Sequence, residues 1–162
     1  MNRRNFLLAA GAAAAAAGFA GVRVASAQEI TSLKGRIKLA VVSGMIRAGK
    51  TLEEKFDVLK QAGFDGVELS LKDGDPESVR KAAANTGIVP HGVIHGWSLD
   101  NIPESLDYAK AVGATSVLVA PGQVSDDIYY DALYEKALSV YRDVAPLFEK
   151  ADVWVLVENV WN

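Results

Sequence analysis

The chain has 162 residues, of which 17 are Lys or Arg and 20 are Asp or Glu, and its formal net charge is −3. This size and balance are typical of one ordinary soluble domain. The absence of cysteine excludes disulfide scaffolds, zinc ribbons and cysteine nucleophiles, and two histidines are too few for a site that needs three imidazoles from this chain.

The first 27 residues differ from the rest and are similar to an export signal. Eleven of them are Ala, and their only charges are three arginines. The adjacent Arg3 and Arg4 precede an uncharged stretch at residues 5–22, and Ala25-Ser26-Ala27 offers the small side chains that a signal peptidase reads. This pattern resembles a twin-arginine signal peptide, which predicts a periplasmic or secreted protein. A retained membrane anchor is the alternative, because 18 uncharged residues reach the lower limit for spanning a bilayer.

Removal of residues 1–27 would leave residues 28–162 as the folded part. Three basic residues and no acidic ones would go with the signal, so the remaining 135 residues would carry a net charge of −6. This acidic balance predicts no binding to nucleic acid, and we expect no stable membrane anchor after signal removal.

From residue 37 onward, short apolar runs alternate with amphipathic segments, which is the pattern of strands and crossover helices in an α/β domain. Their nearly continuous apolar character predicts parallel strands that are buried on both faces. The runs lie at Ile37–Val42, Gly66–Leu69, Val89–Ile94, Ser116–Ala120 and Val153–Val157.

The first two intervening segments carry clear helix signals. Thr51-Leu52-Glu53-Glu54 is a capping box, and Gly63 can take the left-handed conformation that ends a helix. Asp75 followed by Pro76 predicts the start of the second helix, and Gly87 predicts its end.

Two more helices are expected, over about Pro103–Val112 and about Tyr129–Lys150. In the longer one, Pro146 should kink or weaken the last turn. The apolar spacing predicts these inward side chains: Tyr130, Leu133, Ala137, Val140, Val144 and Leu147.

The predicted strands end at regular intervals, at Ser43, Ser70, His95, Ala120 and Glu158. Their separations of 27, 25, 25 and 38 residues favour a barrel of repeated strand–helix units over a doubly wound sheet. A (β/α)8 barrel takes roughly 250 residues. We therefore expect only the N-terminal half of such an α/β barrel here, about five strands and four helices. A half-barrel completed by a second copy, and hence a homo-oligomer, is the alternative.

The segment Gly44–Thr51 matches the phosphate-loop pattern letter by letter and lies between a predicted strand and a predicted helix. Glu53 and Glu54 argue against phosphate binding, because they place negative charge in the first helical turn. Moreover, no later strand ends in an Asp that could hold magnesium. A nucleotide-binding protein remains an alternative at this point.

Polar side chains lie at or near the ends of four predicted strands: Glu68, His95, Gln123 and Glu158. Because catalytic groups of barrels lie at the carboxyl ends of strands, we expect them to converge on one rim. Ordinary structural roles are open to the first three, as a loop-bonding carboxylate, a capped core imidazole and a solvated amide. Glu158 differs, since a carboxylate directly after an apolar strand needs a cation or a hydrogen-bond donor.

Three segments together resemble the sugar phosphate isomerase/epimerase family, which has a xylose isomerase-like barrel and includes ketose 3-epimerases and hydroxypyruvate isomerases. They are Gly63–Leu69, Ser116–Gly122 and Val157–Asn162. The resemblance extends over about Ile37–Asn162 and says little about the substrate.

In that family, a glutamate at the tip of the fifth strand is the first ligand of a divalent metal, usually manganese or magnesium. In epimerases the same glutamate handles a substrate proton. Glu158 matches this position, and the resemblance implies that the other ligands come from later strands. His95 and Trp97 match the third-strand region near the substrate, and Glu68 matches a frequent family glutamate. Gly44–Thr51 corresponds to the first loop of the family, which argues against a phosphate loop.

The resemblance therefore implies a metal-dependent isomerase or epimerase that moves a proton next to a carbonyl of a small-molecule sugar, sugar phosphate or hydroxy-keto acid. The half-barrel alone is expected to be inactive, because one ligand does not hold a catalytic metal. Two alternatives share the barrel. One is an exported sugar-binding protein without catalysis, and the other is a metal-dependent hydrolase or endonuclease, which would need a basic groove.

Overall fold

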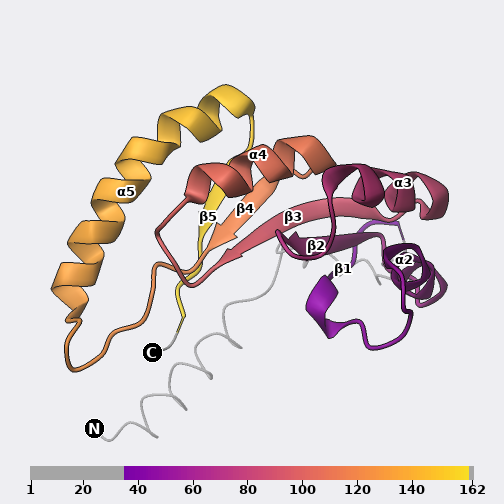
Figure 1. Ribbon diagram of the computed structural model, residues 1–162, viewed down its shortest axis with the longest axis horizontal. Coiled ribbons are helices and arrows are strands. Elements are labelled where there is room, and N and C mark those ends of the chain that lie inside the picture. The colour runs from indigo at the N-terminus through magenta and orange to yellow at the C-terminus, as the bar shows by residue number, and fades with distance from the viewer. Residues whose placement is uncertain (1–34, 161–162) are drawn as a thin grey trace, which may run out of the picture. The chain divides into compact units, whose positions relative to one another are not determined.

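The computed structural model describes residues 35–160, so the predicted export signal lies outside the described residues. The chain divides into residues 1–36, of which Gly35 and Arg36 are described, and a compact unit that begins at Ile37. Strands and helices alternate along this unit (Figure 1). Within residues 35–160, none of the helices has the length and apolar character that crossing a membrane requires.

Five parallel strands form one sheet in the order of the chain, β1-β2-β3-β4-β5. This order has no reversal of direction across the sheet, which is the pattern of a barrel and not of a doubly wound sheet. All five predicted runs contain a strand, although the first strand begins three residues later than predicted. The bounds are β1 Ala40–Val42, β2 Gly66–Ser70, β3 Val89–Gly96, β4 Ser116–Val119 and β5 Trp154–Val157.

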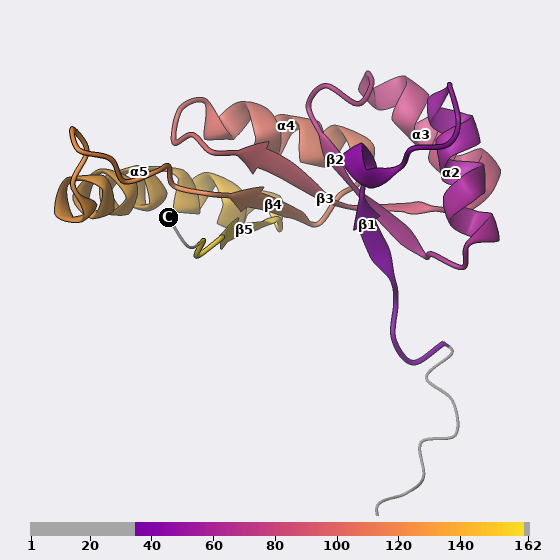
Figure 2. The ribbon, with the colours of Figure 1, turned by 90° about the horizontal axis from the view of Figure 1, so that it is seen from below.

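The helices cover one face of the sheet (Figure 2). Val67 and Val117 point toward the helices and are fully buried, whereas Trp154 is 71% exposed. Consecutive residues are buried in β2 (Gly66 and Val67) and in β4 (Ser116 and Val117), so the predicted burial on both faces is found in these strands, whereas β5 is largely exposed. The helices are α2 Leu52–Gln61, α3 Pro76–Thr86, α4 Ile102–Val112 and α5 Tyr130–Ala151.

The predicted helix boundaries are confirmed by the cap contacts. The Thr51 hydroxyl accepts a hydrogen bond from the Glu54 N–H at 3.2 Å, and the Glu54 carboxylate accepts one from the Thr51 N–H at 3.1 Å. At the start of α3, the Asp75 carboxylate accepts hydrogen bonds from two backbone N–H groups at 3.0 Å each. Gly87 closes α3 with a φ of 77°.

The inward face of α5 is only partly as predicted. Ala137 and Val144 are buried, but Tyr130 is 66% exposed and Leu147 is 48% exposed. The first turn of α5, which begins at Tyr130, extends beyond the strands (Figure 1). In the last turns Phe148, and not Leu147, enters the core. The helix continues through Pro146 to Ala151.

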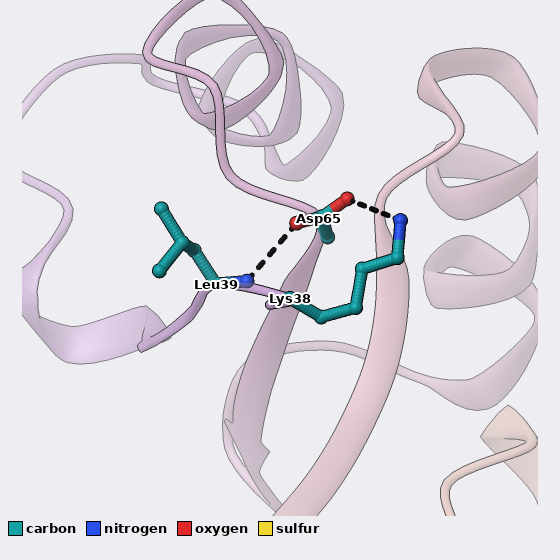
Figure 3. Close-up of polar contacts among 3 residues, drawn as sticks. All are labelled: Lys38, Leu39 and Asp65. Carbon is teal, nitrogen blue, oxygen red and sulfur yellow. Dashed lines mark hydrogen bonds and ion pairs between the residues drawn. The ribbon is translucent and has the colours of Figure 1, made fainter. Parts of the chain in front are cut away.

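Asp65 joins the beginnings of three strands (Figure 3). Its carboxylate accepts hydrogen bonds from the Leu39 N–H at 3.0 Å and from the Lys38 ammonium at 2.9 Å. The Leu39 carbonyl in turn accepts from the Asp65 and Gly66 N–H groups, and the Asp65 carbonyl accepts from the Val89 N–H at 3.0 Å. The hydrogen bond from Leu39, and then the Lys38 contacts, lower the pKa of Asp65.

We expect Asp65→Ala to lower the melting temperature at neutral pH, because the Leu39 N–H and Lys38 lose their acceptor. Since the pKa of Asp65 is lowered in the folded state, its contribution is complete above the ordinary carboxyl pKa and is lost as the pH falls through the lowered value. The difference between wild type and variant should therefore shrink in acid, as thermal unfolding monitored by circular dichroism would show. Asp57→Ala, at an exposed site on α2, is the matched control. Equal melting temperatures for the two variants at neutral pH would contradict this role.

Candidate functional site

Glu158 follows β5 directly, at the edge where the carboxyl ends of all the parallel strands lie. Its N–H donates a hydrogen bond to the Val119 carbonyl at 3.0 Å, so the pairing of β4 with β5 continues through this residue. The side chain itself is exposed. A carboxylate fixed at its backbone but open at its side chain can accept a proton or bind a cation.

A pocket of about 490 Å³ lies beside Glu158, between α5 and the ends of β4 and β5. Tyr130 and Tyr134 are stacked at its wall, with ring centroids 6.1 Å apart. Tyr141 also lines it, and burial raises the pKa of this tyrosine. Of the described residues that line the pocket, Glu158 alone is charged. This is the general form of a small-molecule site, a mostly apolar cavity with few polar groups.

Glu68 lies inside β2, two residues before its end, and not at the strand tip where the sequence places it. Val67 and Leu69 are buried under the helices, so alternation along the strand directs Glu68 to the opposite face. There it pairs in register with Gly92 of β3. A side chain at position 92 would be crowded, because its Cβ would lie 2.9 Å from the Ser116 hydroxyl oxygen. Glu68 is therefore set back from the rim.

His95 and Trp97 lie at the carboxyl end of β3 but in different surroundings. The Nδ1 atom of His95 lies 2.7 Å from the hydroxyl oxygen of Ser105 in α4. Trp97 follows the strand and is 53% exposed. His95 and Glu158 thus share one edge of the sheet, although within residues 35–160 no hydrogen bond or ion pair joins any two of Glu68, His95, Trp97 and Glu158. Gln123 lies exposed in the loop after β4.

A polar cluster at the same edge was not predicted from the sequence. One carboxylate oxygen of Asp73 accepts hydrogen bonds from the Ser43 hydroxyl at 2.5 Å, the Ser70 N–H at 2.6 Å and the Ser70 hydroxyl at 3.0 Å. The spacing of Ser70 and Asp73 is a local turn signal. The contact with Ser43 spans 30 residues and has no local signal.

The segment that matches the phosphate-loop pattern is built differently. Glu54, in the first turn of α2, accepts hydrogen bonds from the Lys50 N–H at 2.6 Å and the Thr51 N–H at 3.1 Å, and these bonds, first that of Lys50, lower the pKa of Glu54. A phosphate loop needs such backbone N–H groups free to face the phosphates. The carboxylate therefore occupies the position that an anion would take.

Glu158 is compatible with a metal site but does not complete one. Among residues 35–160, no group of three His, Asp or Glu side chains is arranged to hold a metal ion. Carboxylate oxygens are the ligands that Mn²⁺ and Mg²⁺ prefer. Glu158 therefore fits as one ligand of such an ion, and further ligands would have to come from outside the described residues.

The model of a protein family described as xylose isomerase-like TIM barrel matches residues 56–162. No curated protein matches the chain in sequence.

Several solved structures share the fold. They include AP endonuclease, family 2, from Brucella melitensis (17% identity, TM-score 0.63), the IolI protein with a bound zinc atom (14%, 0.58) and a sugar phosphate isomerase/epimerase from Parabacteroides distasonis (9%, 0.56). The similarity covers 76%, 75% and 75% of this chain, and 55%, 51% and 51% of those chains. The chain thus spans about half the length of these structures. The comparison confirms the N-terminal portion of a (β/α)8 barrel.

We expect the chain not to bind nucleoside triphosphates at Gly44–Thr51, because Glu54 occupies the backbone N–H groups there. The melting temperature should be unchanged by magnesium and ATP, whereas a ligand at 100 times its Kd would stabilise the fold by about 2.7 kcal/mol. Lys50→Ala is the matched variant. An ATP-induced rise in melting temperature that this variant abolishes would show that the phosphate-loop interpretation is right.

Proposed function

Because the chain belongs to the xylose isomerase-like TIM barrel family, we propose that the whole protein is a metal-dependent isomerase or epimerase of a small sugar, sugar phosphate or hydroxy-keto acid. The observation that carries the proposal is the exposed Glu158 carboxylate at the end of β5, beside a pocket with no other charged residue among its described lining. A solved structure of the same fold is named a sugar phosphate isomerase/epimerase, which supports this class.

The chemistry requires a carboxylate within hydrogen-bond reach of a carbon-bound hydrogen next to a carbonyl. In the proposal, Glu158 removes that hydrogen as a proton and holds it on its carboxylate. Return of the proton to the neighbouring carbon gives the isomer. Epimerisation further needs a proton donor on the opposite face of the same carbon.

We propose that Glu158 also serves as one ligand of a divalent metal, manganese, magnesium or a similar ion. Such a metal, when bound, polarises the carbonyl oxygen and so acidifies the adjacent carbon. The IolI protein, which shares the fold, was solved with a zinc atom, and this supports a metal in the present site.

The substrate would be held by groups near the same edge. Trp97 exposes an indole that suits the apolar face of a sugar ring. We assign His95 and Glu68 to substrate binding as well, with Glu68 reaching the substrate from the face opposite the helices. A nuclease is disfavoured, because a chain with a net charge of −3 offers little attraction to a phosphate backbone.

We also propose that the protein is exported by the twin-arginine route and acts outside the cytoplasm. Replacing both Arg3 and Arg4 by Lys should block this export, because the signal is read by a receptor that requires the arginine pair. Fractionation of expressing cells, followed by immunoblotting, measures the effect, with Arg23→Lys as the control. Undiminished export of the double variant would contradict the assignment.

Glu158→Gln should lower the rate of proton exchange by about 10²- to 10⁴-fold, since the amide cannot accept the proton. The measurement is incorporation of solvent deuterium into D-fructose, D-tagatose, hydroxypyruvate and the phosphates of the two sugars, with the full-length protein and added Mn²⁺. Glu149→Gln, at an exposed position near the end of α5, is the matched control.

One result would count against the enzyme, and another against the role of Glu158. Absence of deuterium from every compound would favour a sugar-binding barrel without catalysis. Equal exchange by wild type and Glu158→Gln would remove Glu158 as the base.

A further inference from the structure

The imidazole of His95 has one paired and one unpaired nitrogen. Nδ1 lies 2.7 Å from the hydroxyl oxygen of Ser105, which is fully buried in α4. Nε2 is shielded from solvent and has no hydrogen-bond partner within residues 35–160. A buried nitrogen of this kind is uncommon in folded proteins and calls for an explanation.

For the neutral ring, two placements of the proton are compatible with this contact. If Nδ1 donates to Ser105, the hydroxyl proton of Ser105 has no acceptor among residues 35–160, and the Nε2 lone pair is unpaired as well. If the Ser105 hydroxyl donates to Nδ1, the neutral ring carries its proton on Nε2, and this N–H is the one donor left unpaired. The second placement is the more stable, because each unsatisfied buried polar group is costly.

We infer that Ser105 is a positioning residue that holds neutral His95 in the Nε2–H tautomer, so that His95 offers a hydrogen-bond donor to an oxygen of a bound molecule. In this tautomer Nε2 carries a proton, so binding of a metal at Nε2 would require that proton to move to Nδ1 or to leave the ring. The tautomer stands independently of the proposed function. The identity of the acceptor, a carbonyl or hydroxyl oxygen of the substrate, rests on the proposed function.

The position of His95 fits this role. It lies at the carboxyl end of β3, and Glu158 lies at the carboxyl end of β5 on the same edge. Nε2 is shielded from solvent, so a substrate oxygen reaches it only if the atoms that cover it move, and the hydrogen bond that then forms is protected from water.

The tautomer can be measured directly by NMR. The chain has two histidines, so labelling with ¹⁵N-histidine gives two imidazole spin systems, and the exposed His91 provides the reference. His91→Gln assigns the signals. For His95 we expect a pyrrole-like shift at Nε2 and a pyridine-like shift at Nδ1. A protonated Nδ1, or averaged shifts like those of a free imidazole, would overturn the inference.

Two variants of Ser105 test the positioning role. Ser105→Ala should move both His95 nitrogens toward averaged shifts, and Ser105→Thr, which keeps a hydroxyl, should restore the single tautomer. Unchanged shifts in Ser105→Ala would show that Ser105 does not select the tautomer. If the added methyl group of Thr prevents folding, comparison of the wild-type and Ser105→Ala spectra still shows whether Ser105 selects the tautomer of His95.

Addition of Zn²⁺ to the full chain tests whether His95 keeps this tautomer when a metal is offered. The His95 shifts should stay in place, and zinc-dependent loss of the Nε2 proton would overturn that part of the inference.

Two replacements of His95 test the donor role in the deuterium-exchange assay. His95→Gln keeps an N–H group near the position of Nε2, whereas His95→Leu has none, so kcat/KM for exchange should be about tenfold higher in the Gln variant. Equal losses in the two variants would overturn the donor role. If the tautomer is found and no compound exchanges, the proposed function and the substrate oxygen fail together, while the role of Ser105 stands.

Discussion

Asp65 lies where the beginnings of β1, β2 and β3 meet, and the relative position of these strands depends on its contacts. The Asp65 carboxylate accepts a hydrogen bond from the Leu39 N–H, and the Asp65 N–H donates one to the Leu39 carbonyl. The Asp65 carbonyl accepts a hydrogen bond from the Val89 N–H. These bonds align Ala40 with Gly66 and Gly66 with Val89. Once the amino ends are aligned, the length of each strand and the register shifts after Val67 and after Ile94 decide which residues emerge at the carboxyl edge. The eight residues of β3, with a register shift between Ile94 and Gly96, place His95 at that edge.

Close approach between strands adds a second constraint. At Gly66, a Cβ would lie 2.9 Å from the Val89 carbonyl oxygen, and at Gly92 it would lie 2.9 Å from the Ser116 hydroxyl. Only glycine allows the backbones and side chains to come this close without displacement. A Cβ at Gly92 would lie 3.9 Å from the Cγ atom of Glu68, which is an ordinary van der Waals contact, so the need for glycine here comes from Ser116.

Much of the fold could be predicted from the sequence because its signals are local. The capping box at Thr51 and the Asp75 cap with Pro76 act within a few residues, and α2 and α3 begin directly after these two capping residues. Glu158 was placed correctly for the same reason, since it directly follows an apolar run. Long-range contacts have no such signal. The Asp73 contact with Ser43 spans 30 residues, and the exposed Tyr130 begins a first turn of α5 that extends beyond the strands (Figure 1).

The proposed chemistry depends on a difference between two side chains at one edge of the sheet. A reaction that moves a proton next to a carbonyl needs a proton acceptor at the carbon and a hydrogen-bond donor or cation at the carbonyl oxygen. Glu158 is an acceptor, and His95 is a donor only while its proton lies on Nε2. With the proton on Nδ1, both side chains would be acceptors and neither could bind the carbonyl oxygen. The buried hydroxyl of Ser105 therefore decides whether this edge carries two bases or a base and a donor.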